Sequence, residues 1–178
     1  MRQLCSLLLF VSLFFGCSVK LPTLQEKQNE SERLTHLLVS LSRDIDRSEA
    51  KDLAKSSIDY SYELSHRYKV IASPWLQNAL VNMGIKKRGL CHEWTEDLLY
   101  FLVKRNYRTF TFHTITANEG YYNEHNALSV SKKGGSLKHS IVLDAWRNSG
   151  KLYFIELTKD TKYEWKERDG LYGILPPK

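Results

Sequence analysis

The sequence predicts an α+β domain in which helices come first and an antiparallel β-sheet follows. From Ser31 to Arg105, apolar residues recur at three- and four-residue spacing, the period of an amphipathic helix. After Asn106 the pattern changes to alternation in segments rich in β-branched and aromatic residues, which is typical of strands. The chain has 178 residues, 42% of them hydrophobic and 26% charged. This length and composition favour one globular domain with a packed core.

The helical part divides into four segments. The first begins at Ser31 and the second near Ser48. The third lies between Ser73, a good N-cap, and Gly84, a good stop signal. The fourth follows at once and has Cys91 in its first turn.

The pattern after Asn106 predicts four strands and indicates a fifth after them. Loops between them are marked by glycine and asparagine. The expected strands cover residues 109–117, 125–131, 139–146, 151–157 and 161–167, and the tail 170–178 is expected to be irregular.

The first 16 residues predict export. Arg2 precedes an apolar run over residues 4–15, and the absence of acids there is typical of a secretory signal peptide. The run is too short to span a membrane as a mature helix. We therefore exclude residues 1–16 from the folded domain.

Gly16-Cys17 resembles the processing site of a bacterial lipoprotein, which implies that Cys17 is acylated and becomes the first residue. Ser18 in the next position favours export to an outer membrane. The polar residues 17–30 then form a lipidated tether and residues 31–178 a single domain. The alternatives are an ordinary signal peptide and a short N-terminal anchor.

Cys91 is the leading candidate for a functional residue. Of the three cysteines, Cys5 leaves with the signal peptide and Cys17 carries lipid, so Cys91 has no disulfide partner. A single thiol in an exported protein is a candidate reactive group. Backbone N–H groups at a helix N-terminus can stabilise a thiolate or hold an oxyanion. The alternative is a small buried hydrophobic residue.

A histidine and an aspartate are predicted to lie side by side on the sheet. If Gly134-Gly135 forms a two-residue hairpin turn, His125 lies directly opposite Asp144 on one face. We expect the Cys91 helix to pack on that face, since its other side chains are small. These small residues are Ala127 opposite Val142 and Ser129 opposite Ser140.

These three residues together predict nucleophilic catalysis. The Cys91 thiolate would attack a carbonyl, His125 would take and return the proton, and Asp144 would orient the imidazole. The Cys91 N–H is one oxyanion donor by geometry. Three preceding side-chain amides are candidates for the second donor: Gln77, Asn78 and Asn82.

The segments GLCHEWTEDL, HNALSV and IVLDAW resemble the cysteine, histidine and aspartate motifs of the transglutaminase-like cysteine peptidase superfamily. The resemblance extends over residues 74–157 and is greatest to the bacterial envelope branch of this superfamily. It implies a papain-like core with Cys91 as nucleophile, His125 as base and Asp144 as orienting acid. It also implies acyl transfer or hydrolysis at an amide bond of an envelope protein or a peptidoglycan peptide.

Two positions depart from the family pattern. The usual His-Ala-Trp sequence is replaced by His125-Asn126-Ala127, and the residue after Cys91 is His92. Both departures bear on the substrate rather than on the triad. Hydrolysis and transamidation are left open, as is the oligomeric state.

Two other functions compete with this interpretation. Cys91, His125 and Asp144, joined by His92, would form a hydrolytic zinc site, but the sequence has no CxxC or HExxH pattern. A non-catalytic envelope lipoprotein would use the same fold for binding. We expect no metal and no cofactor. Four histidines have no partner that the sequence identifies: His36, His66, His113 and His139.

The net charge of +6 comes from lysines and arginines spread along the chain. The longest basic run is only residues 86–88, so nucleic-acid binding is not expected. The expected partners are a protein or peptide substrate and the membrane that holds the lipid anchor.

Overall fold

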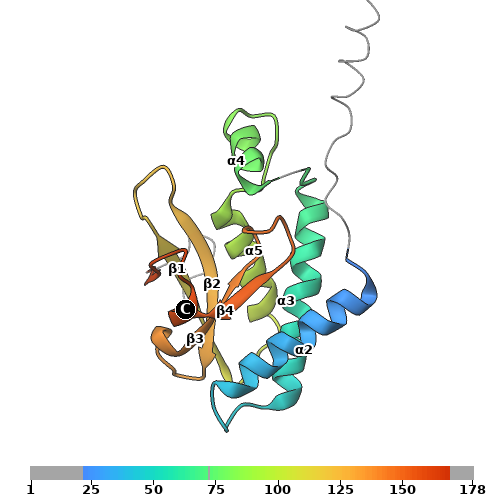
Figure 1. The fold of residues 1–178 in the computed structure, drawn as a ribbon, viewed down its shortest axis with the longest axis vertical. Coiled ribbons are helices and arrows are strands. Elements are labelled where there is room, and N and C mark those ends of the chain that lie inside the picture. The colour runs from blue at the N-terminus through green and yellow to red at the C-terminus, as the bar shows by residue number, and fades with distance from the viewer. Residues whose placement is uncertain (1–21, 72, 169–178) are drawn as a thin grey trace, which may run out of the picture.

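The computed structural model describes residues 22–71 and 73–168, and within them it confirms the α+β class (Figure 1). The expected signal peptide, Cys17 and the tail lie outside the described residues. The helices are α2 (Leu24–Ser40), α3 (Arg47–Arg67), α4 (Pro74–Asn82) and α5 (Cys91–Val103). The strands are β1 (Phe110–Ala117), β2 (His125–Lys132), β3 (Ser140–Asp144), β4 (Tyr153–Glu156) and β5 (Lys166–Glu167), with short 3-10 helices η2 (Leu137–His139) and η3 (Leu157–Lys159).

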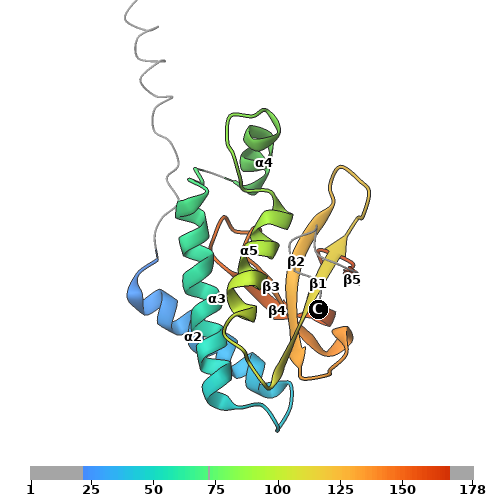
Figure 2. The same ribbon diagram turned by 180° about the vertical axis from the view of Figure 1, so that it is seen from behind.

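The five strands form one antiparallel sheet in the order β4-β3-β2-β1-β5. Helices α2, α3 and α5 cover one face of it, and α4 projects at one end of the molecule (Figures 1 and 2). None of the helices in residues 22–71 and 73–168 is long and apolar enough to cross a membrane.

Helix α2 begins earlier than the sequence pattern predicts. The Thr23 hydroxyl accepts a hydrogen bond from the Glu26 N–H at 3.1 Å, and the Glu26 carboxylate accepts one from the Thr23 N–H at 2.7 Å. This capping box satisfies two N–H groups and starts the helix. The expected tether over residues 17–30 is therefore wrong from Leu24 onward, because those residues belong to the folded domain.

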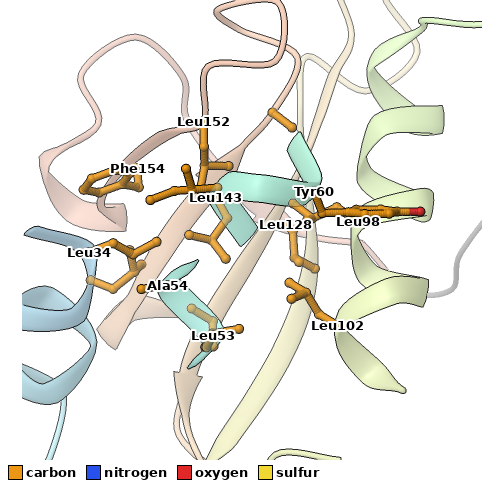
Figure 3. Close-up of a cluster of buried hydrophobic side chains, with 14 of the residues drawn as sticks. Leu34, Leu53, Ala54, Tyr60, Leu98, Leu102, Leu128, Leu143, Leu152 and Phe154 are labelled. Carbon is orange, nitrogen blue, oxygen red and sulfur yellow. The ribbon is translucent and has the colours of Figure 1, made fainter. Parts of the chain in front are cut away.

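The main core lies between the helices and the sheet (Figure 3). Leu98 and Leu102 of α5 point toward Leu128 of β2, and Leu53 of α3 reaches the same cluster. The prediction that α5 packs on the face of His125 is thus wrong. The large side chains of the opposite face offer more apolar area to bury. The face of His125 carries a smaller cluster, Ile115, Ala117, Ala127, Val142 and Trp165.

The predicted register of β2 and β3 is also wrong, by two residues. Leu128 pairs with Leu143, which places Ala127 rather than His125 across from Asp144. The connection is longer than a two-residue turn because it includes the 3-10 helix η2. A shift of two residues keeps every side chain on its face, so His125 and Asp144 remain diagonal neighbours.

The turn that follows β3 requires a glycine. Gly150 has φ +100°, and a Cβ there would collide with Ser65 of α3. We expect Gly150→Ala to lower the free energy of unfolding by about 2–4 kcal/mol in urea titration. Gly120→Ala is the control. Gly120 also has a positive φ, +81°, but a Cβ added there would meet no other residue's atoms within 4 Å. Its cost should stay near 1 kcal/mol, and equal losses would rule out the contact with Ser65 as the cause.

Candidate active site

The turn before α5 is tightly built and holds Cys91 at the first helical position. Gly89 has φ +133°, and a Cβ there would lie 2.6 Å from Cγ of Gln77. The Glu93 carboxylate accepts hydrogen bonds from the N–H groups of Gly89 and Leu90 at 2.6 and 2.9 Å. The N–H groups of the first helical turn, including that of Cys91, have no acceptor within the helix.

The Cys91 thiol lies against the beginning of β2. It is 7% exposed, and its sulfur is 3.8 Å from both the Glu124 carbonyl oxygen and the Asn126 amide nitrogen. These two residues flank His125 in the sequence. The thiol therefore lies near His125 at the N-terminal end of β2, although the rest of α5 packs on the opposite face of the sheet.

His125 is buried, and one of its ring nitrogens is held by Asp144. Nε2 is 2.7 Å from Oδ2 of Asp144. Nδ1 is buried and has no hydrogen-bond partner among the described residues, although Cys91 is near enough to contribute to the pKa of the imidazole. Three aromatic rings surround the imidazole at centroid distances of 4.6–5.4 Å: Tyr163, Trp146 and Trp165.

The surroundings favour the protonated form of His125. Burial acts to lower its pKa, but the charge and hydrogen bond of Asp144, followed by the interaction with Cys91, raise the pKa of His125 to about 9. A protonated imidazole that is paired with a carboxylate and lies beside a cysteine is an arrangement that can activate the cysteine for nucleophilic attack.

Asp144 is fixed by Arg147, a residue that the sequence analysis missed. Burial acts to raise the pKa of Asp144, but the charge and hydrogen bond of His125 and then Arg147 hold it below its ordinary value. The Arg147 backbone N–H and Nε each donate to the carboxylate at 2.9 Å. The other end of the guanidinium donates to Asp160 at 2.7 and 3.2 Å. The carboxylate therefore has little freedom to rotate away from His125.

A second polar network, also missed, holds Asn126. Its Nδ2 donates to Glu124 at 3.1 Å, and its Oδ1 accepts from Arg168 at 2.9 Å. Arg168 also donates to Glu124 at 2.6 Å. The only hint in the sequence was that Asn126 stands where alanine is usual in the resembling family. The network aims a buried amide N–H group at the Cys91 sulfur.

The three side-chain amides that were candidates for the second oxyanion donor do not contact Cys91 in any hydrogen bond of the described residues. Gln77 donates through Nε2 to the carbonyls of Tyr68 at 3.2 Å and Arg88 at 2.9 Å, so its amide hydrogens hold the turn before α5. Asn78 accepts from Trp146 Nε1 at 3.0 Å. Asn82 is exposed.

The geometry does not favour the zinc interpretation. His125 Nε2 is bonded to Asp144, whose carboxylate is already occupied by Arg147, so the groups face one another rather than a common point. Within residues 22–71 and 73–168, no group of three potential ligands is arranged to hold a metal ion.

Two of the histidines without expected partners do have them. His113 lies 2.6 Å from Glu167 and 2.8 Å from Ser131, and His139 lies 3.3 Å from Ser136.

Comparisons of the chain with protein-family models, curated proteins and solved structures returned no match. The site therefore has to be interpreted from its own residues.

Proposed function

We propose that this protein is a cysteine-dependent acyl-transfer enzyme, a peptidase or amidase of transglutaminase-like type. One observation supports this proposal above all: a buried His125–Asp144 pair lies beside a thiol at a helix N-terminus. In this proposal Cys91 is the nucleophile, His125 the general acid and base, and Asp144 the orienting carboxylate.

In the first half of the reaction, the Cys91 thiolate attacks the carbonyl carbon of an amide and forms a C–S bond. The proton on His125 Nδ1 passes to the leaving nitrogen as the C–N bond breaks, which releases the amine and leaves a thioester on Cys91. The hydrogen bond from Nε2 to Asp144 keeps Nδ1 directed at the reacting atoms throughout.

In the second half, a water molecule or an amine attacks the thioester. His125, now neutral, takes the proton of the attacking group at Nδ1, and the Cys91 thiolate leaves. A water acceptor gives hydrolysis and an amine acceptor gives transamidation. Both products use the same residues.

Asn126 is the second oxyanion donor in this mechanism, together with the Cys91 backbone N–H. A nitrogen 3.8 Å from the sulfur is close enough to hydrogen-bond an oxygen on the carbon that the sulfur attacks. The bonds of Asn126 to Glu124 and Arg168 fix the amide in advance of the reaction. Such preorganisation is what makes an oxyanion donor effective.

The proposed substrate is an amide bond in an envelope protein or a peptidoglycan peptide. The signal-like residues 1–16 and the Gly16-Cys17 processing site support export and lipid anchoring, with the outer membrane as the proposed destination. The mature enzyme would then act on substrates within reach of that membrane.

A chromogenic acyl donor tests the proposal without knowledge of the substrate. With p-nitrophenyl acetate, the wild type should release a burst of about one p-nitrophenolate per chain as the thioester forms. Cys91→Ser should show no such burst. Asn126→Ala should keep the burst amplitude but slow its rate by about 10²-fold, because one oxyanion donor is gone. A burst that persists in Cys91→Ser, or no burst in the wild type, would refute the proposal, and with no burst in the wild type binding without catalysis becomes the better account.

A further inference from the structure

Helix α4 and the segments beside it carry apolar side chains that the rest of the fold does not cover. Trp75 is 50% exposed, Met83 71% and Ile85 62%. Trp75 lies in the first turn of α4, Met83 is the C-cap of that helix, and Ile85 follows it closely. We call this the α4 surface, and its apolar members are Ile71, Trp75, Leu76, Met83 and Ile85.

The same part of the chain is entirely free of acids. No aspartate or glutamate occurs between Glu63 and Glu93, whereas five lysines and arginines do. The two arginines are paired with carboxylates outside this segment. The three lysines form no ion pair within the described part of the chain, and they are Lys69, Lys86 and Lys87. The α4 surface is thus an apolar patch with a basic border.

The α4 surface lies at the same end of the molecule as the candidate active site. Both views show α4 and the β1–β2 loop projecting at this end, with the start of α5 just below α4 (Figures 1 and 2). Trp75 stacks edge-on against Trp146 at 5.3 Å, and Trp146 contacts His125 at 4.7 Å. The β1–β2 loop adds the exposed Tyr121 and Tyr122.

We propose that the α4 surface docks on an anionic membrane, with its apolar side chains among the lipid headgroups. Tryptophan suits this depth because its ring is apolar and its N–H is polar. Lys69 and Lys87 are exposed and Lys86 is half-buried, and lysines beside an apolar patch are attracted to anionic lipid. The lack of any acid between Glu63 and Glu93 avoids repulsion. Docking would bring Cys91 to the lipid–water interface. Only this last step, which directs the enzyme to amide bonds at the membrane surface, rests on the proposed function.

Trp75 is a built-in reporter of such docking. The other three tryptophans, Trp94, Trp146 and Trp165, are buried. Full-length protein would be bound to vesicles of phosphatidylcholine, alone or mixed with phosphatidylglycerol, carrying brominated acyl chains that quench tryptophan. The fluorescence of protein that floats with the vesicles would be measured. We expect the tryptophan emission to be quenched when the vesicles contain phosphatidylglycerol and to change little when they do not. In Trp75→Phe we expect no quenching on either lipid.

Charge-neutral variants show whether the basic border is responsible. Lys86→Gln with Lys87→Gln should weaken the phosphatidylglycerol-dependent quenching by on the order of tenfold in lipid concentration. The matched control is Lys132→Gln with Lys133→Gln, at the end of β2 away from α4, which should leave the quenching unchanged. Cys91→Ser should quench like the wild type, so a failure of catalysis does not affect this test. Equal quenching on both lipids, an equal effect of the control pair, or no quenching would each overturn the proposal.

Discussion

Replacing His125 with alanine is expected to slow the acetylation of Cys91 by p-nitrophenyl acetate by about 10²–10⁴-fold at neutral pH. In the proposed mechanism, this change removes the imidazolium that stabilises the thiolate and the group that moves the proton. Rapid mixing of excess enzyme with the ester would measure the rate constant of the single acylation step.

The control for this experiment is His139→Ala. His139 is exposed, and its imidazole hydrogen-bonds with Ser136 at 3.3 Å, so the acylation rate of this variant should stay within a factor of about two or three of the wild type. If His125→Ala acylates as fast as His139→Ala, the thiol does not depend on the imidazole and the triad is wrong.

Asp144→Asn is expected to reduce both activity and stability. The amide neither fixes the imidazole tautomer nor stabilises the imidazolium, so we expect acylation to slow by on the order of 10²-fold or more. It also leaves the buried guanidinium of Arg147 with Asp160 as its one charged partner among the residues that the structure describes. The free energy of unfolding at pH 7 should fall by about 3 kcal/mol in urea titration.

The same variant should change how stability depends on pH. In the wild type, the pKa of His125 is raised to about 9 from its ordinary value of 6.5. The resulting stabilisation is full below about pH 6.5 and is lost as the pH rises through about 9. In Asp144→Asn the pKa of His125 should be lower and this decline smaller, which histidine NMR titration and urea unfolding would both detect.

Asp160→Asn is the matched control, because it removes a carboxylate from Arg147 but none from His125. It should destabilise the protein while leaving the pKa of His125 close to about 9. A drop of similar size in both variants would mean that the field of the whole cluster, rather than Asp144, sets the charge of His125.

The sequence predicted the helices and the first four strands well because their signals are local, but of the strand expected over residues 161–167 only β5, Lys166–Glu167, forms. The period of apolar residues and the cap Ser73 identify the helices, and α4 begins right after that cap. The sequence failed at the start of α2, where a capping box formed by Thr23 and Glu26 outweighs the absence of an apolar stripe. In that case two hydrogen bonds decide where the helix begins.

The packing of the sheet was less predictable, since it depends on loops and on total buried area. The register failed because Gly134-Gly135 is only part of a longer connection that includes η2. The two-residue error preserved the face of His125 and Asp144, so the pair survived it. Helix α5 covers the face of the sheet that carries the larger apolar side chains, because that face offers more area to bury. The prediction assumed instead that the helix would approach the face with the smaller side chains.

The residues that support the pair escaped prediction because they act through tertiary contacts. Arg147 donates to Asp160, thirteen residues further along the chain. Arg168 directly follows the edge strand β5 and donates to Asn126 of β2, with β1 between the two strands. No spacing rule brings such side chains together. Only the identity of Asn126, in place of a small apolar residue, indicated that the site has an additional polar group.

The central claim is that an acyl group is carried by Cys91, and peptide mapping tests it most directly. The wild type would be mixed with p-nitrophenyl acetate at pH 7, stopped with acid within the burst, digested and examined by mass spectrometry. We expect one acetyl group on the peptide that contains Cys91, and we expect it to disappear on longer incubation as water releases it. Acetyl groups confined to lysine or serine side chains, with Cys91 unmodified, would contradict it.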